Sequence, residues 1–158
     1  MLSDGMVVSI NVNPAGGVPK YAVPEADVTL QGVRGDTQRD LKHHGGPQRA
    51  VSLYSFELIQ ALRAEGHPIA PGTTGENLTL RGLAWATLQI GDQLAIGERL
   101  VIEITDYATP CATIADSFSD NIFTRIAQKR YPGWSRLYAQ VLIEGRVCAG
   151  DRVVLTVL

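Results

Sequence analysis

The residues best suited to chemistry are one cysteine and one polar segment. Cys111 lies in Thr109-Pro-Cys-Ala-Thr-Ile114, directly after an apolar run that is typical of a strand. The segment Asp40-Leu-Lys-His-His-Gly-Gly-Pro-Gln-Arg49 gathers cations, imidazoles and glycines. The thiolate is the reactive form of cysteine, and cationic neighbours favour it. The two features together predict a site where a soft thiolate meets an anion-binding loop, as a metal or sulfur centre on a phosphorylated cofactor requires.

The glycine-rich part of that segment has the composition of an anion-binding loop. Glycines let backbone amides approach an anion closely, and lysine and arginine add charge-assisted hydrogen bonds. The candidate anion-binding residues are Lys42, Gly45, Gly46 and Arg49. Adjacent histidines point in different directions, so we expect at most one of His43 and His44 to face the site, where it could transfer protons near neutral pH. A polar turn without a ligand is the alternative interpretation.

Two further glycine-bearing loops add candidate residues. In Gly72-Thr-Thr-Gly-Glu-Asn-Leu78, Glu76 has the chemistry of an acid, a base or an orienting acceptor, and Asn77 can hydrogen-bond the edge of a heterocycle. The loop Asn13-Pro-Ala-Gly-Gly-Val-Pro-Lys20 ends in a cation that suits a phosphate. A solvated turn is the ordinary explanation of such loops.

Several other residues have a structural role as their first interpretation. Cys148 fits a strand or a strand end, where packing is expected. Trp134 is expected either to wall a cofactor pocket or, more commonly, to pack in the core. Arg125 and Lys129 are expected on the solvated face of a helix.

The composition limits the class of protein. A chain of 158 residues fits one domain, spanning residues 1–158, and its formal net charge of -2 provides no broad basic field for nucleic acid. Two cysteines cannot form a disulfide framework, and each is expected as a free thiol in a reducing compartment. No signal peptide and no membrane-spanning apolar run is evident, so we expect a cytoplasmic protein without membrane contact.

Short apolar runs separated by glycine and proline predict a mainly β domain, a barrel with two peripheral helices. The pattern predicts a hairpin of 93–96 with 99–105, and a second, closing pair of 137–143 with 152–157. The other expected strands cover 6–12, 27–31, 50–54 and 77–80. One helix is expected over 56–65, capped by Ser55 and ended at Gly66. The other begins at Ser117 or Ser119 and runs to Arg130.

An ordered set of motifs along nearly the whole chain resembles the MOSC domain family (molybdenum cofactor sulfurase C-terminal domain). The chain is most similar to stand-alone bacterial members of the branch linked to hydroxylaminopurine resistance. The motifs are Asn13-Pro-Ala-Gly-Gly-Val-Pro-Lys20, Gly35-Asp36, Lys42-His-His-Gly-Gly46, Arg49-Ala-Val51, Gly75-Glu-Asn-Leu78, Gly91-Asp92, Pro110-Cys111, Tyr131-Pro-Gly-Trp134 and Ala149-Gly-Asp151.

The resemblance implies a MOSC-type β-barrel and a molybdenum cofactor (molybdopterin), with Cys111 as the family cysteine that ligates molybdenum or carries sulfur. A thiolate is a soft ligand that suits a metal already bound by dithiolene sulfurs. Lys20, Arg49 and the 42–46 loop would then supply donors to the pterin phosphate. Glu76 and Asn77 would orient cofactor or substrate.

The activity that the resemblance implies is reduction of an N-hydroxylated base or a related N–O compound, with electrons from a separate donor protein. Amidoxime-reducing relatives carry an additional N-terminal β-rich domain and an arginine before the cysteine, whereas Thr109-Pro110 precedes Cys111 here. Their phosphate-binding residues therefore do not transfer by position. The sulfurases carry a separate cysteine desulfurase domain, so we do not expect sulfur mobilisation by this chain alone. The family is also associated with pyridoxal phosphate binding.

Three other functions stay open at this point. The domain can be a non-catalytic carrier that holds sulfur as a Cys111 persulfide or passes cofactor to another enzyme. A cysteine–histidine hydrolase would need a histidine beside Cys111, and no motif places one there. A zinc site would draw on His43, His44, Cys111 and Cys148, but the usual paired spacings are missing. The sequence does not predict an oligomeric state.

Overall fold

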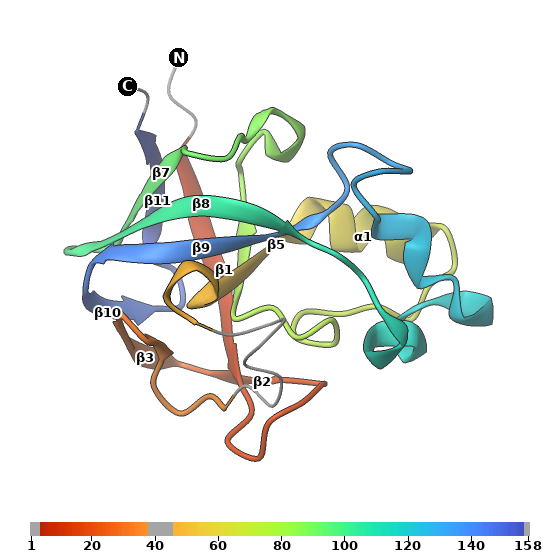
Figure 1. The fold of residues 1–158 in the computed structure, drawn as a ribbon, viewed down its shortest axis with the longest axis horizontal. Helices are drawn as coiled ribbons and strands as arrows, with labels where there is room; N and C mark the ends of the chain where they lie inside the picture. Colours follow the sequence, from red (N-terminus) through yellow and green to blue (C-terminus); the bar gives the residue numbers. More distant parts are fainter. Residues whose placement is uncertain (1–3, 38–45, 157–158) are drawn as a thin grey trace.

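The architecture is a closed antiparallel-rich β-barrel (Figure 1). The computed structural model describes residues 4–37 and 46–156. Within these residues seven strands hydrogen-bond in the order β11-β7-β8-β9-β5-β6-β1, and pairing of β1 with β11 closes the ring. The barrel strands are β1 (Asp4–Val12), β5 (Val51–Ser55), β6 (Leu78–Arg81), β7 (Gln93–Ile96), β8 (Leu100–Ala108), β9 (Arg136–Ile143) and β11 (Arg152–Thr156). The predicted mainly β barrel is confirmed.

Smaller strands decorate the barrel. β2 (Tyr21–Val23) extends the main sheet beyond β1. A separate sheet has the order β10-β3-β4, from β3 (Glu25–Thr29), β4 (Gly32–Val33) and β10 (Gly145–Cys148). The sequence pattern indicated β3, and the strand or strand end expected at Cys148 is β10; β2 and β4 were not indicated, because such short strands leave little periodicity to detect.

Alternating apolar residues fill the barrel. The burial of β7 and β8 follows the period of two that a strand with one buried face shows. Every residue of β5 is buried, and on one face Ser52 contacts Gly75 while Tyr54 contacts Trp85 and Trp134. The largest fully buried side chains include Ile10, Leu53, Tyr54, Leu78, Leu94, Ile96 and Ile102.

One predicted helix is confirmed. α1 (Phe56–Ala64) begins after Ser55, whose hydroxyl accepts a hydrogen bond from the Leu58 amide. Such a cap satisfies one of the amides that the first helical turn leaves without a partner. The helix is the crossover between β5 and β6, which pair in parallel. No helix among residues 4–37 and 46–156 is both long and apolar enough to cross a membrane.

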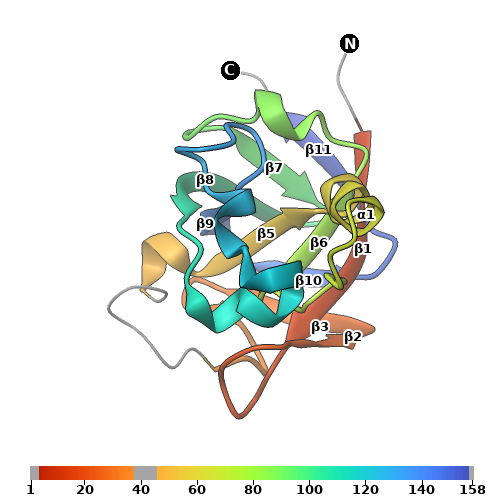
Figure 2. The same ribbon diagram turned by 90° about the vertical axis from the view of Figure 1, so that its right-hand side faces the viewer.

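The second predicted helix is wrong. The segment instead forms three short 3-10 turns, η3 (Ala112–Ser117), η4 (Ser119–Asn121) and η5 (Phe123–Ile126). Asp120 and Asn121 have φ values of 56° and 58°, in the left-handed region that no α-helix passes through. Figure 2 shows these turns beside α1 on one side of the barrel. The Ser119 hydroxyl donates to the Gly66 carbonyl at 2.6 Å, which ties the segment to the end of that helix.

The second predicted strand pair is also wrong. The predicted hairpin of β7 and β8 is confirmed, and its register runs from Gln93 opposite Glu103 to Ile96 opposite Leu100. β9, however, pairs with β5 and β8, while β11 pairs with β7 and β1. β10 leaves the barrel between them to pair with β3, so β11 returns on the far side of β7. Two further 3-10 turns, η1 (Pro47–Arg49) and η2 (Trp85–Thr87), complete the elements.

Candidate functional site

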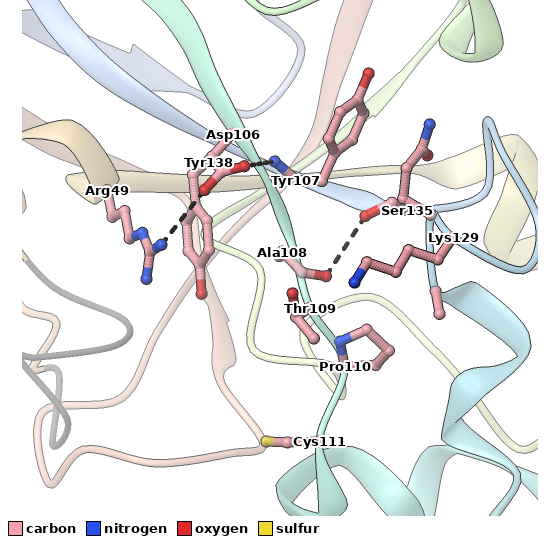
Figure 3. Close-up of a pocket in the computed structure, with 12 residues that line it drawn as sticks. Arg49, Asp106, Tyr107, Ala108, Thr109, Pro110, Cys111, Lys129, Ser135 and Tyr138 are labelled. Atoms are coloured by element: carbon pink, nitrogen blue, oxygen red, sulfur yellow. Dashed lines mark hydrogen bonds and ion pairs between the residues drawn. The ribbon is translucent and has the colours of Figure 1, made fainter.

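A pocket of about 580 Å³ opens at the end of β8 (Figure 3). That volume lies within the range of roughly 300–1,000 Å³ common for ligand sites. Three stretches far apart in sequence build it: η1, the run from β8 into Cys111, and residues 127–138. Its lining residues are Arg49, Asp106, Tyr107, Ala108, Thr109, Pro110, Cys111, Ala127, Gln128, Lys129, Ser135 and Tyr138.

Cys111 lies on the pocket wall, half-buried, just after β8 ends at Ala108. Its Sγ lies 2.9 Å from Thr113 Oγ1, so the threonine hydroxyl can donate to the sulfur when it is a thiolate. The local chain path brings the two side chains together, because Cys111 is the extended residue before η3 and Thr113 lies in the first turn of η3. The cysteine therefore presents an accessible sulfur with one hydrogen-bond donor beside it.

Arg49 lies at one end of the pocket, against β8 and β9. Its Nη2 is 3.3 Å from Asp106 Oδ2, and its guanidinium lies 5.2 Å from the centre of the Tyr138 ring. Asp106 and Tyr138 face each other across the two strands. Arg49 is thus the one predicted anion-binding residue in the described chain that the structure brings to the same pocket as Cys111.

A β-bulge sets this geometry. On β9, Tyr138 and Ala139 are consecutive, but their partners Asp106 and Ile104 on β8 are separated by Thr105. An extra residue of this kind bends a strand and changes the direction of its side chains. The Thr105 hydroxyl donates to the Gln48 carbonyl in η1, which attaches the turn that carries Arg49.

Tyr138 is a buried phenol on the pocket wall. Burial raises the pKa of Tyr138 above the usual value of a phenol, and the nearby Arg136 and Arg49 cations oppose this effect. The hydroxyl is therefore protonated at neutral pH. Neither Tyr138 nor Asp106 was predicted from the sequence; the available signal was a polar group near one end of each of two long apolar strands.

Lys20 and Asn77 meet in a different, buried network. The Lys20 ammonium forms an ion pair with Asp36, and Asn77 Nδ2 donates to the same carboxylate at 2.9 Å. Asn77 Oδ1 also accepts from the Ser52 amide at 3.1 Å. Neither Lys20 nor Asn77 lines the pocket in the described residues. Their contacts connect the 13–20 loop to β5, the strand that follows η1. Lys20 and Asn77 therefore support the fold around the pocket and do not line it.

Glu76 is fully buried beneath the 72–77 loop. Its carboxyl oxygens accept hydrogen bonds from the Gly72 amide at 3.1 Å, Thr79 Oγ1 at 2.9 Å and Thr74 Oγ1 at 2.9 Å. Burial raises the pKa of Glu76, and these hydrogen bonds act against the rise. A glycine is needed at position 72, where an added Cβ would lie 2.3 Å from the Lys20 carbonyl oxygen. Glu76 has no surface in the pocket, which argues for a structural role.

The remaining predicted loop residues, Lys42, His43, His44 and Gly45, lie outside the described residues. Gly46 is described and has a φ of 91° at the start of η1, the turn that ends in Arg49. Among residues 4–37 and 46–156, no three His, Cys, Asp or Glu side chains gather as a metal site would require. The zinc hypothesis stays a prediction, because two of its four ligands are His43 and His44.

Three residues given structural interpretations can now be placed. Cys148 ends β10, with Sγ 3.6 Å from Glu25 Oε2, and does not line the pocket. Trp134 packs partly buried against the core and also lies outside the pocket. The expectation that Arg125 lies on a solvated face is wrong, because its guanidinium lies 4.1 Å from the Trp134 ring centre and 4.5 Å from that of Tyr131.

The family model for the MOSC domain matches residues 40–154. This range contains η1, Cys111 and every other lining residue of the pocket. The chain belongs to the MOSC domain family. The MOSC-type barrel expected from the motifs is therefore confirmed by both the family match and the strand order.

Curated MOSC relatives share about a third of the aligned residues. YflK of Bacillus subtilis (strain 168) is 33% identical over 122 residues, covering 77% of this chain and 54% of YflK. YiiM of Escherichia coli (strain K12) is 30% identical over 130 residues, covering 79% of this chain and 56% of YiiM. A Gibberella moniliformis protein named Reductase is 30% identical over 129 residues, 78% of this chain and 22% of its own length. The alignments thus span about half, or less, of these relatives.

Solved structures share the fold. YiiM from Geobacillus stearothermophilus superimposes with a TM-score of 0.74 at 26% identity, covering 97% of this chain and 75% of that one. The YUAD protein from Bacillus subtilis superimposes with a TM-score of 0.81 at 15% identity over the whole of both chains. At that identity the likeness to YUAD shows the fold alone.

Proposed function

We propose that this MOSC domain binds the molybdenum cofactor in the pocket, with Cys111 as a molybdenum ligand, and reduces N-hydroxylated bases or related N–O compounds. The observation that carries the proposal is the position of Cys111, whose sulfur lies on the wall of a cavity that also contains Arg49. A distant relative that carries the name Reductase supports the class of activity.

The donor set of the pocket fits the cofactor. A thiolate is the protein ligand that best matches a metal in a sulfur-rich environment, and Cys111 offers one on an open wall. A guanidinium is the cation that matches a phosphate in shape and charge, and Arg49 supplies it. The cavity volume of about 580 Å³ leaves room for a pterin-sized ring system. The 42–46 loop remains a proposed source of further phosphate donors.

The bound cofactor would supply two-electron redox chemistry, and the chain supplies binding and protons. Reducing an N–OH group to an N–H group consumes two electrons and two protons and releases water. The electrons come from a separate donor protein in this proposal. The Tyr138 phenol, which burial keeps protonated, can donate a proton to the departing oxygen. His43 or His44 can restore that proton from solvent, since imidazole titrates near neutral pH.

A Cys111→Ser variant tests this function. We expect turnover of 6-N-hydroxylaminopurine with reduced methyl viologen to fall to the uncatalysed level, because a serine hydroxyl is a much poorer ligand for a soft metal. Cys148→Ser is the matched control, since Cys148 lies outside the pocket, and it should retain wild-type turnover. Full turnover of Cys111→Ser at full molybdenum content would contradict the proposal.

A sulfur or cofactor carrier is the second candidate, because Cys111 is partly exposed and has a hydroxyl donor 2.9 Å away that suits an anionic sulfur. A carrier would accumulate persulfide on Cys111 when incubated with a cysteine desulfurase and its substrate. Intact mass of wild type and Cys111→Ser distinguishes the two candidates: a 32 Da increase confined to wild type, without turnover, favours the carrier. Pyridoxal phosphate binding stays a prediction.

A further inference from the structure

The pocket has a second cation that the cofactor proposal does not use. Lys129, in the turn after η5, lines the pocket together with Arg49. In Figure 3 the two cations lie on opposite sides of the Ala108–Pro110 segment, and the Lys129 side chain extends toward that segment. The pocket therefore offers two separate positions for negative charge.

The two cations differ in how their charges are balanced. Arg49 lies 3.3 Å from Asp106, the one carboxylate among the described lining residues. The Lys129 ammonium has no hydrogen bond or ion pair within the part of the chain that the structure describes. Arg49 faces Asp106, so among the described lining residues no carboxylate is left to balance the charge of Lys129, which is exposed at the mouth of the pocket. An ammonium without a carboxylate partner attracts anions.

Gln128, the neighbour of Lys129, adds a hydrogen-bond donor to the pocket, because its acceptor oxygen is already in use. Gln128 Oε1 accepts a hydrogen bond from the Gly133 amide at 3.1 Å, which leaves the amide NH₂ of Gln128 to donate. The single proton of the Ser135 hydroxyl is used within the fold, since its Oγ lies 2.6 Å from the Arg136 carbonyl oxygen and 3.4 Å from that of Ala108. The Lys129 ammonium and the Gln128 amide NH₂ are therefore the donors at this end of the pocket, and together they suit an oxyanion. Tyr107, Pro110 and Ala127 provide apolar surface beside it.

We propose that Lys129 binds an anionic group of the substrate, so that the pocket selects N-hydroxylated compounds that carry a phosphate or a carboxylate over neutral ones. The proposal rests on the proposed function for the reaction itself. Arg49 then holds the cofactor phosphate, and Lys129 with Gln128 holds the substrate anion. The preference is for a planar base with an acidic substituent, such as a nucleoside monophosphate, over the free base.

Calorimetric titration with unreactive analogues tests the preference without relying on turnover. Adenosine 5′-monophosphate is compared with adenosine, and orotate with uracil, so that the pairs separate phosphate from carboxylate recognition. In at least one of the two pairs, we expect the anion to bind about tenfold more tightly than its neutral partner. A preference for the monophosphate indicates phosphate recognition, and a preference for orotate indicates carboxylate recognition. Lys129→Gln should remove that preference, and Lys129→Arg should keep it. Arg130→Gln removes the same charge from the next, exposed residue outside the pocket and should match wild type.

Two results of the titrations would overturn the proposal, and a third comes from the cofactor content. Either no anion is preferred, or the preference survives in Lys129→Gln. Molybdenum and pterin content of the same variants provides the second measurement, and Lys129→Gln should retain both; their loss would assign Lys129 to the cofactor and not to the substrate. Because the titrations involve no reduction, they can succeed even if the proposed reductase activity fails.

Discussion

At the scale of single residues, the chemistry depends on contacts between positions far apart in sequence. The position of Cys111 just after a strand was predictable, because an apolar run leads directly into Thr109-Pro-Cys111. Its companions Arg49, Asp106 and Tyr138 meet through strand pairing and a bulge at Thr105, and no spacing in the sequence reveals such a contact. Glu76 shows the reverse case: its polarity suggested catalysis, yet its hydrogen bonds are used within the fold.

Glu76 makes the stability of the protein depend on pH. Since burial raises the pKa of the folded Glu76 above the unfolded value of 4.5, the folded state binds the proton more tightly. The stabilisation from this group is fully present below pH 4.5 and is lost as the pH rises through the folded pKa. We expect Glu76→Gln to remove this loss, which urea unfolding at a series of pH values above 4.5 measures.

The matched control for this prediction is Glu98→Gln in the exposed turn between β7 and β8. It removes the same charge from a solvated position and should keep the pH dependence of wild type. A Glu76→Gln curve parallel to that of wild type would mean that Glu76 is ionised in the folded protein, contrary to the effect of its burial.

At the scale of elements, regular strands and α1 were predictable, and the irregular 112–130 segment was not. The apolar residues Ile122, Phe123 and Ile126 have helical spacing, but Ile122 is 50% exposed and only Ile126 is fully buried. Asp120 and Asn121 have left-handed backbone conformations, which interrupt the predicted helix between Ser117 and Ile122. Because Asn and Asp tolerate that conformation better than other residues, Asp120-Asn121 was the available signal.

Arg125 holds this irregular segment against α1. Its guanidinium makes two hydrogen bonds to Glu65, at 2.8 and 2.9 Å, and lies over the rings of Tyr131 and Trp134. We expect Arg125→Lys to lower the free energy of unfolding by about 1 kcal/mol, since an ammonium cannot form the paired hydrogen bonds or stack flat on a ring. Urea unfolding measures this change.

Arg130→Lys is the control, because Arg130 is exposed and its side chain makes no hydrogen bond, ion pair or ring contact within the described residues. It should leave the free energy of unfolding unchanged. Equal stability of the two variants would show that the Arg125 contacts contribute nothing measurable. The same segment continues into Lys129, so loosening it should also weaken the preference for anions in the pocket.

At the scale of the whole molecule, pairing of the first strand with the last closes the barrel. β1 and β11 pair directly, with Asp4 opposite Val154. Barrel architecture was predictable from the number of short alternating strands, but the partners of β9 and β11 were not, because pairing between distant strands depends on the path of the whole chain. The pocket inherits this dependence, since η1, β8 and β9 become neighbours only in the closed barrel.

The measurement that tests the central claim most directly is the molybdenum content and released-pterin fluorescence of wild type and Cys111→Ala, produced in a host that makes the cofactor. The pocket geometry predicts stoichiometric molybdenum and pterin in wild type and their loss in Cys111→Ala, because the sulfur on the pocket wall is the proposed metal ligand. Absence of both from wild type, in a host that loads a control molybdoenzyme, would contradict the claim, as would full molybdenum content in Cys111→Ala.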